Sequence, residues 1–403
     1  MKNVGPGVLV SAAFIGPGTV TVCTLAGVNF GFALLWALLL SVVACLVLQE
    51  MAARLGIITG RGLSEVIREE IKNPVFRFLS IALIFAAIVL GNAAYEAGNI
   101  TGAVLGMSAV VPSPNMQIGA VSLDLWSLLI GFIAFILLAI GSYKVLEKVF
   151  IVLVAIMSIS FVVTAFMTQP QILPLLKGLF IPSSGTAGIL TVMALIGTTV
   201  VPYNLFLHAS LVGEKWKGAS ALKIARKELF WAILLGGLVS MAIVVTAAAS
   251  GITKVATAAD LAVGLEPLFG PYAKFFIAIG LFAAGISSAI TAPLAAAYVV
   301  RGCLGWKKGL NSVKFKMVWA GILLLGVFFS SLGLKPVEII QFAQVANGIL
   351  LPVVAVFLFW VVNRSSIMGE HKNSVIQNLM GLVIIAITVF LGAKSIYTVL
   401  ETL

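Results

Sequence analysis

The chain consists of long apolar runs separated by short polar segments. Eleven runs can be drawn, at residues 8–31, 32–53, 78–107, 125–142, 149–168, 188–212, 229–250, 273–300, 317–334, 337–362 and 375–400. Each is close to or longer than the roughly 20 residues that a helix needs to cross a bilayer. Because the runs lack the two-residue alternation of barrel strands, they predict an all-α polytopic membrane protein with about 11 transmembrane helices.

Composition excludes a soluble protein. Of the 403 residues, 61% are hydrophobic and 10% are charged, whereas soluble domains are about 45–50% apolar and about 25% charged. The net charge of +11 would suggest a nucleic-acid partner in a soluble protein. Here it is better explained by basic loops beside anionic lipid, so we expect a lipid bilayer and no nucleic acid as partner.

Basic residues mark alternate loops and so predict the orientation. They follow runs 2, 4, 6, 8 and 10: Arg54, Arg61, Arg68, Lys72 and Arg77; Lys144 and Lys148; Lys215, Lys217, Lys223, Arg226 and Lys227; Arg301, Lys307, Lys308, Lys314 and Lys316; Arg364 and Lys372. Loops rich in Lys and Arg stay in the cytoplasm. We therefore expect a cytoplasmic N-terminus and an outside C-terminus, in a membrane of the bacterial inner type.

Two runs carry a break that a continuous helix would not tolerate. The first contains Gly16-Pro17-Gly18-Thr19, and the sixth contains Thr198-Thr199-Val200-Val201-Pro202-Tyr203-Asn204. Proline removes a backbone donor and clashes with the preceding turn, so both segments are predicted to unwind there. Runs 1 and 6 are corresponding members of two five-helix halves. A matched pair of this kind indicates a substrate site between inverted repeats; the alternative is two kinked structural helices.

The halves and the domain follow from this pairing. Repeat one covers about 8–168, repeat two about 188–362, and an extra helix about 375–400, all in a single transmembrane domain of residues 1–403. No Pro- or Ser-rich linker divides the series.

Several stretches in the same order resemble the NRAMP family of proton-coupled divalent-metal transporters. They are Gly16-Pro17-Gly18-Thr19, Leu48 to Gly56, Pro202 to His208, Ala283 to Ser288, and Gln344 with Leu351-Pro352. The resemblance implies a leucine-transporter-like fold with a 5+5 inverted repeat and broken helices 1 and 6. It also implies a substrate site formed by Gly16, Pro17, Gly18, Thr19, Thr198, Thr199, Val201, Tyr203 and Gln344.

The resemblance also assigns family roles to individual positions, and most of the residues differ here. Gly16 and Thr19 stand where the family has the metal-binding aspartate and asparagine. Val201 replaces the methionine ligand, Thr198 the alanine that binds through its carbonyl, and Tyr203 a histidine tied to proton movement. Gln344 is retained, and Glu96 matches a glutamate on the proton pathway.

These replacements leave the substrate open. The resemblance implies a divalent metal cation, but manganese and iron selectivity usually depends on a sulfur or nitrogen ligand, and no metal ligand can be assigned with assurance. Helix N-termini at a double break instead favour a small anion or a neutral polar solute. A third alternative is a non-transporting membrane sensor.

Other buried polar residues have a functional and a structural interpretation. Glu96 lies inside a run, where a carboxylate indicates a proton carrier or a path-lining residue, or else a neutral hydrogen-bonded side chain. His208 is either a proton carrier or a packing residue. Asn92, Asn99 and Asn347 either line the path or join helices through hydrogen bonds.

The energy source and the absence of an enzyme activity are also predicted. No G-x-x-x-x-G-K-[ST] loop is present, which favours a secondary transporter. The family resemblance implies coupled protons as a further partner. Only two histidines occur, and no cluster of His, Asp and Glu or Ser/His/acid set falls within the runs, so we expect neither an enzyme nor a cofactor.

Overall fold

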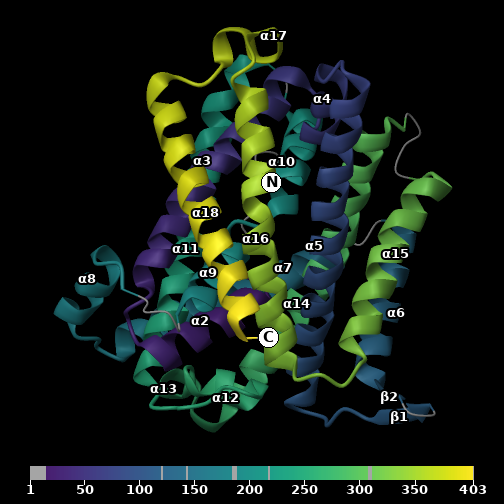
Figure 1. The fold of residues 1–403 in the computed structure, drawn as a ribbon. Helices are drawn as coiled ribbons and strands as arrows, with labels where there is room; N and C mark the ends of the chain where they lie inside the picture. Colours follow the sequence, from purple (N-terminus) through teal and green to yellow (C-terminus); the bar gives the residue numbers. More distant parts are fainter. Residues whose placement is uncertain are drawn as a thin grey trace.

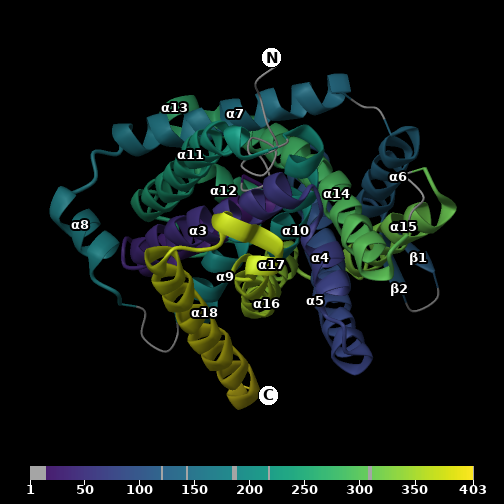
Figure 2. The same cartoon turned by 90° about the horizontal axis from the view of Figure 1, so that it is seen from above.

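The computed structural model describes residues 15–118, 121–141, 144–183, 188–216, 218–306 and 311–402. The long helices are α2 (Pro17–Phe30), α3 (Leu35–Thr59), α5 (Pro74–Ser108), α6 (Leu125–Ile140), α7 (Lys144–Met167), α9 (Ile189–Thr199), α10 (Pro202–Lys215), α11 (Leu222–Ala249), α14 (Ala273–Leu304), α15 (Val313–Ser330), α16 (Pro336–Val362) and α18 (Val375–Thr402). Most of them run along one common direction and form one bundle (Figure 1), whereas α7 lies across that direction (Figure 2).

Short elements connect these helices. They are α4 (Leu63–Glu70), α8 (Ile172–Phe180), η1 (Ala219–Ala221), α12 (Ala258–Val263), α13 (Glu266–Phe269), η2 (Gly270–Tyr272), α17 (Ser365–Met368) and η3 (Gly369–His371). The strands β1 (Asn115–Ile118) and β2 (Val121–Asp124) form an antiparallel hairpin in which Asn115 pairs with Asp124. This hairpin departs from the all-α prediction, since the short polar link after α5 was not expected to pair.

The apolar runs predicted from the sequence coincide with helices from the second run onward. Nine helices in the described part of the chain are long and apolar enough to cross a membrane, and α6 is a shorter apolar helix. The first run is represented by α2, and its residues 8–14 lie outside the described residues. The chain is thus an all-helical integral membrane protein apart from its small hairpin.

Capping residues fix where several helices begin. Asn73 precedes Pro74, and its side-chain oxygen accepts hydrogen bonds from the backbone N–H of Val75 at 3.0 Å and of Phe76 at 3.2 Å. Asp124 caps α6 and Ser312 caps α15 in the same way. These polar caps satisfy N–H groups that have no partner within the helix, so each helix begins where its apolar run begins.

Small residues allow the central helices to pack closely. Seen along the bundle axis, α3, α9, α10, α16 and α5 occupy the middle, while α7, α18 and the α6–α15 pair lie at the periphery (Figure 2). At position 106 on α5, a glycine faces the carbonyl of Ala278 on α14, and an added Cβ would lie 2.6 Å from that oxygen. Close backbone contact of this kind is the usual means of helix association in membranes.

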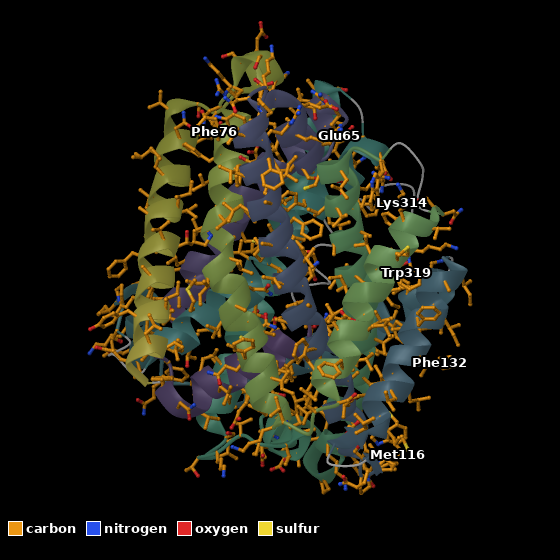
Figure 3. All side chains as sticks on the ribbon, turned by 45° about the vertical axis from the view of Figure 1, so that its right-hand side comes forward. Glu65, Phe76, Met116, Phe132, Lys314 and Trp319 are labelled. Carbon is orange, nitrogen blue, oxygen red and sulfur yellow. The ribbon has the colours of Figure 1, made fainter. Side chains whose placement is uncertain are left out.

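The outer surface is apolar along the length of the bundle and polar at its ends. Phe76 and Phe132 are 65% and 61% exposed and point outward (Figure 3). Glu65 and Lys314 lie toward one end of the bundle, and Met116 of the hairpin lies at the other (Figure 3). Lipid therefore faces the middle of the molecule, and α4 and α17 mark the end where several basic loops gather (Figure 1).

Candidate functional site at the meeting of two interrupted helices

The sixth apolar run is interrupted at the predicted position. Helix α9 ends at Thr199, α10 begins at Pro202, and the two valines between them are fully buried. Val201 has an extended backbone, with φ −76° and ψ 123°. Because Pro202 has no N–H, the α-helical bonding of α9 cannot continue through this point. The break predicted from the sequence is confirmed.

The first run also starts a helix at its proline. Gly16 is extended, with φ −99° and ψ 178°, and α2 begins at Pro17. On α5, a Cβ at Gly102 would collide with the ring of Pro17. This close contact fixes the start of α2 against α5. The predicted half-helix before the break lies outside the described residues.

A hydrogen bond joins the two interrupted segments. Thr19 Oγ1 and Thr198 Oγ1 are 2.8 Å apart, and both side chains are buried. Thr19 lies in the first turn of α2, whereas Thr198 lies in the last turn of α9. Residues separated by 179 positions thus meet where a substrate site was predicted.

Gln344 of α16 completes this contact. Its side chain occupies the space beside Gly18, where any Cβ would collide with the amide. Its backbone carbonyl touches α9 at Gly197, where a Cβ would also collide. Gln344 Oε1 is buried and has no hydrogen-bond partner in the described part of the chain. We call Gly18, Thr19, Thr198 and Gln344 the crossing.

Other residues predicted for the substrate site lie beside the crossing with different contacts. The Thr199 hydroxyl donates to the Leu195 carbonyl at 2.9 Å, so it is bonded within α9. The Tyr203 ring packs edge-on against Tyr95 of α5, with ring centroids 5.4 Å apart. Val201 is fully buried. Their roles in binding remain predictions.

The residues predicted for a proton pathway are dispersed over several helix contacts. Glu96 packs against Gly326 of α15 and accepts a hydrogen bond from Asn99 Nδ2 at 3.2 Å. Its other carboxylate oxygen, Oε1, is buried without a partner among the described residues. His208 Nδ1 lies 2.8 Å from Gln49 Oε1 of α3.

The two remaining predicted asparagines bind or face neighbouring helices. Asn92 Nδ2 donates to the Ala292 carbonyl of α14 at 2.9 Å. Asn347 lies near Gly91 of α5, and its Nδ2 is buried with no partner in the described ranges. Asn92 therefore joins helices, while Asn347 retains free hydrogen-bonding capacity one turn after Gln344.

The structure changes the picture of one basic residue, Arg54, which the sequence placed among the basic residues of the loop after the second run and its margins. It lies inside α3, and only 2% of its side chain is exposed. Its guanidinium binds Glu50 of α3, with Nε–Oε1 at 3.0 Å, and also Asn373 Oδ1 and the His371 carbonyl. Arg226 of α11 binds the same carboxylate at 2.7 Å. We call Glu50, Arg54, Arg226 and Asn373 the Glu50 cluster.

A sequence signal for part of this cluster was present. Glu50 and Arg54 are four residues apart, the spacing that brings a carboxylate and a guanidinium together on a helix. Asn204, two residues after Pro202, was likewise not singled out. Both polar atoms of its side chain are buried without a partner in the described chain, which places further unsatisfied polarity at the break.

The crossing carries no formal charge. Its polar side chains are two hydroxyls and an amide, and Val201 next to it is apolar. Over the ranges that the structure describes, no three His, Cys, Asp or Glu side chains gather closely enough to hold a metal ion. What the crossing offers is oxygen: two hydroxyl oxygens, the Gln344 carbonyl oxygen, and the last carbonyls of α9, which have no partner within their helix.

Sequence comparison assigns the chain to a family. Residues 7–398 match the model of the natural resistance-associated macrophage protein-like (Nramp) family. The chain belongs to the Nramp family. It is 28% identical over 402 residues to the divalent metal cation transporter MntH of Bacillus subtilis, covering 96% of this chain and 91% of the relative. As a member of this family, the protein is a membrane transporter and not an enzyme.

Solved structures establish the fold. A crystal structure of the Eremococcus coleocola manganese transporter superposes with a TM-score of 0.79 at 20% identity, covering 98% of this chain and 86% of that one. MhsT in complex with L-phenylalanine superposes with a TM-score of 0.62 at 16% identity, covering 98% of both chains. The Nramp chain therefore has the leucine-transporter-like fold that the family resemblance implied.

Proposed function

We propose that this Nramp-family protein is a secondary-active transporter that carries a divalent metal cation through the crossing. The observation that carries the proposal is the hydrogen bond between Thr19 and Thr198, because it brings the two interrupted segments together around Gln344. The names of the relatives, a divalent metal cation transporter and a manganese transporter, support this class of cargo.

The membrane arrangement proposed with it has eleven spans. Repeats at about 8–168 and 188–362 are inverted relative to each other, and α18 is additional. The N-terminus is cytoplasmic and the C-terminus is outside, in a membrane of the bacterial inner type. The gathering of α4, α17 and Lys314 toward one end (Figures 1 and 3) supports this orientation, because basic loops remain in the cytoplasm.

The chemistry of the crossing favours a cation that keeps part of its water. Bare divalent ions face a severe desolvation penalty in a membrane, and the crossing supplies only neutral oxygens. A hard ion such as Mg²⁺ normally retains several waters and binds oxygen ligands. The C-terminal end of α9 adds partial negative charge at Thr198. We propose that the site lacks the preference for thiophilic metals that a methionine ligand at position 201 would provide.

A second candidate cargo is a small anion or a neutral polar solute. The observation that favours it is the start of α2 at Pro17 and of α10 at Pro202, since helix N-termini carry partial positive charge. No carboxylate belongs to the crossing to offset this charge.

Ion uptake into proteoliposomes tests the two candidates. We expect saturable uptake of Mg²⁺ and Mn²⁺ by the purified protein and measurable binding by calorimetry. Absence of both, together with binding of a small anion from the same panel, would contradict the metal proposal and support the second candidate. Restoring the family residues with Gly16→Asp and Val201→Met should increase divalent-cation affinity; no increase would show that the site is misplaced.

Proton coupling through Glu96 is part of the same proposal. The free, buried Oε1 of Glu96 supports a role in carrying a proton, because an intramembrane carboxyl group without a full set of partners is costly to keep. Glu96→Gln should abolish the dependence of uptake on a proton gradient and leave cation binding measurable. Uptake that stays equally dependent on pH in this variant removes Glu96 from the mechanism.

A further inference from the structure

The crossing contains no sulfur or nitrogen ligand of the kind that separates transition metals from calcium, so discrimination against Ca²⁺ would require another property of the site. We infer that the Thr19–Thr198 hydroxyl pair is the element that determines specificity, by admitting small six-coordinate cations and rejecting Ca²⁺. This inference rests on the proposed function and adds to it a residue pair and a selection rule.

The first step is the spacing of the two oxygens. Thr19 Oγ1 and Thr198 Oγ1 are 2.8 Å apart. In an octahedral oxygen shell with bonds of about 2.0–2.1 Å, as around Mg²⁺, neighbouring ligands are about 2.8–3.0 Å apart. With the bonds of about 2.3–2.6 Å that Ca²⁺ requires, the same six-ligand geometry needs about 3.3–3.7 Å. The hydroxyl pair therefore matches one edge of the smaller shell without moving.

The second step is the rigidity of that edge. The start of α2 is held because Pro17 lies directly against Gly102 of α5. The end of α9 is held against α16 because Gly197 lies directly against the Gln344 carbonyl. A Cβ added to Gly197 would also lie only 2.7 Å from the backbone nitrogen of Gly348. Both segments thus lie directly against a neighbouring helix with no room for a side chain between them, and close packing of this kind resists changes in the spacing of the two hydroxyls.

The third step is the remaining coordination. Gln344 Oε1 is a buried oxygen without a partner among the described residues. It belongs to an amide whose Nε2 lies against Gly18, next to Thr19. Three neutral oxygens from the protein leave the other positions of the shell to water, as is usual for Mg²⁺. The two hydroxyls bond to each other; to bind a cation, each turns its hydrogen away and directs a lone pair at the ion.

Competition between Ca²⁺ and Mg²⁺ tests the inference. In proteoliposomes, the concentration of Ca²⁺ that halves Mg²⁺ uptake should exceed the half-saturating Mg²⁺ concentration by on the order of tenfold or more in the wild type. Thr19→Val and Thr198→Val keep the shape and remove one oxygen each, so this ratio should fall toward one in both. Thr19→Ser and Thr198→Ser keep the oxygen and should keep the ratio.

A matched control separates the pair from a general effect of losing a buried hydroxyl. Thr164 on α7 is fully buried, and its hydroxyl donates to the Ser160 carbonyl of its own helix at 2.8 Å; Thr164→Val should leave the ratio unchanged. If a valine variant does not fold, Thr198→Ala gives the same test with a smaller side chain, and calorimetry with Mg²⁺ and Ca²⁺ replaces uptake where uptake is too slow.

The outcomes distinguish this inference from the proposed function. If the valine variants still take up divalent cations and the ratio of the inhibitory Ca²⁺ concentration to the half-saturating Mg²⁺ concentration is unchanged, the inference is overturned and the proposed function stands. Wild-type uptake that does not discriminate against Ca²⁺ does the same. Absence of any divalent-cation binding or uptake overturns the proposed function itself.

Discussion

The crossing and the Glu50 cluster are both polar groups between helices, the second with Arg226 half exposed, yet their hydrogen bonds are satisfied in opposite ways. In the Glu50 cluster, two guanidinium groups share one carboxylate, and Arg54 also reaches Asn373 and the His371 carbonyl. In the crossing, Gln344 Oε1 has no partner in the described chain. A fully paired network holds helices together, whereas a buried oxygen without a protein partner is the kind of group that a cargo can bind.

The two groups also differ in charge: the Glu50 cluster contains ionised side chains, and the crossing contains none. Arg54 of the Glu50 cluster binds the carbonyl of His371 in η3, which directly follows α17 at one end of the bundle (Figure 1). The crossing, between two helix interruptions, has only neutral donors and acceptors. In this chain, charged groups join the helices of the scaffold, whereas neutral oxygens lie at the proposed binding site.

The largest expected effect on stability is at the Glu50 cluster. Glu50→Gln leaves the Arg54 guanidinium buried without its anionic partner, which typically costs about 3–5 kcal/mol. We expect a large fall in the thermal unfolding midpoint of the purified protein. The surface pair Lys335–Glu338 serves as control, and Glu338→Gln should leave the midpoint unchanged. Equal midpoints for Glu50→Gln and wild type would show that the cluster does not hold the scaffold.

A smaller effect is expected where α9 touches α16. Gly197→Ala places a Cβ against the Gln344 carbonyl, and overpacking of this kind costs about 1–3 kcal/mol. It should lower the unfolding midpoint and also reduce cation uptake, because it separates two sides of the crossing. Gly321 on α15 has open space around it, so Gly321→Ala should change neither. If both variants behave alike, the close contact at position 197 is unimportant.

Gln344→Leu should separate function from stability. Removing a buried oxygen that has no partner relieves a penalty of about 1–3 kcal/mol, so the unfolding midpoint should stay the same or rise, while uptake falls. The same substitution at Gln49 should lower the midpoint, since Gln49 Oε1 is bonded to His208. A Gln344→Leu variant that is destabilised and transports normally would show that Gln344 belongs to the scaffold and not to the proposed binding site.

The smallest effect is expected in the link between α11 and α14. Burial raises the pKa of Asp260, but hydrogen bonds from the backbone N–H groups of Ala256 and Thr257 and from the Thr257 hydroxyl outweigh it and lower the pKa below its usual value. The resulting stabilisation is therefore present above the ordinary aspartate pKa of about 3.9 and is lost as pH falls through the lowered value. Asp260→Asn should lower the unfolding midpoint slightly at pH 7, and the difference should shrink only in strong acid. A difference that shrinks on moving from pH 7 to pH 5 would contradict this.

The sequence was informative wherever a single segment determines the outcome. Continuous apolar runs predicted the helices, and Pro202 predicted the end of α9, because both depend on local composition and backbone chemistry. The hydroxyl contact could not be predicted: it depends on how α2 and α9 lie in space, and Thr199 was as plausible as Thr198 until its bond to Leu195 was seen.

Burial of Arg54 was missed for a related reason. Its position at the end of an apolar run suggested a loop, and only the length of α3, which continues to Thr59, places it inside the helix. Its partners Arg226 and Asn373 come from distant parts of the chain, so no local pattern reveals that the charge is satisfied.

The most direct test of a neutral-oxygen cation site is the structure of the protein with Mn²⁺, whose anomalous scattering identifies it. The account predicts one metal ion between α2, α9 and α16, bound to Thr19 Oγ1, Thr198 Oγ1 and Gln344 Oε1 and otherwise to water. An ion located at Glu96 or at the Glu50 cluster, with the crossing still closed by its hydroxyl bond, would contradict it.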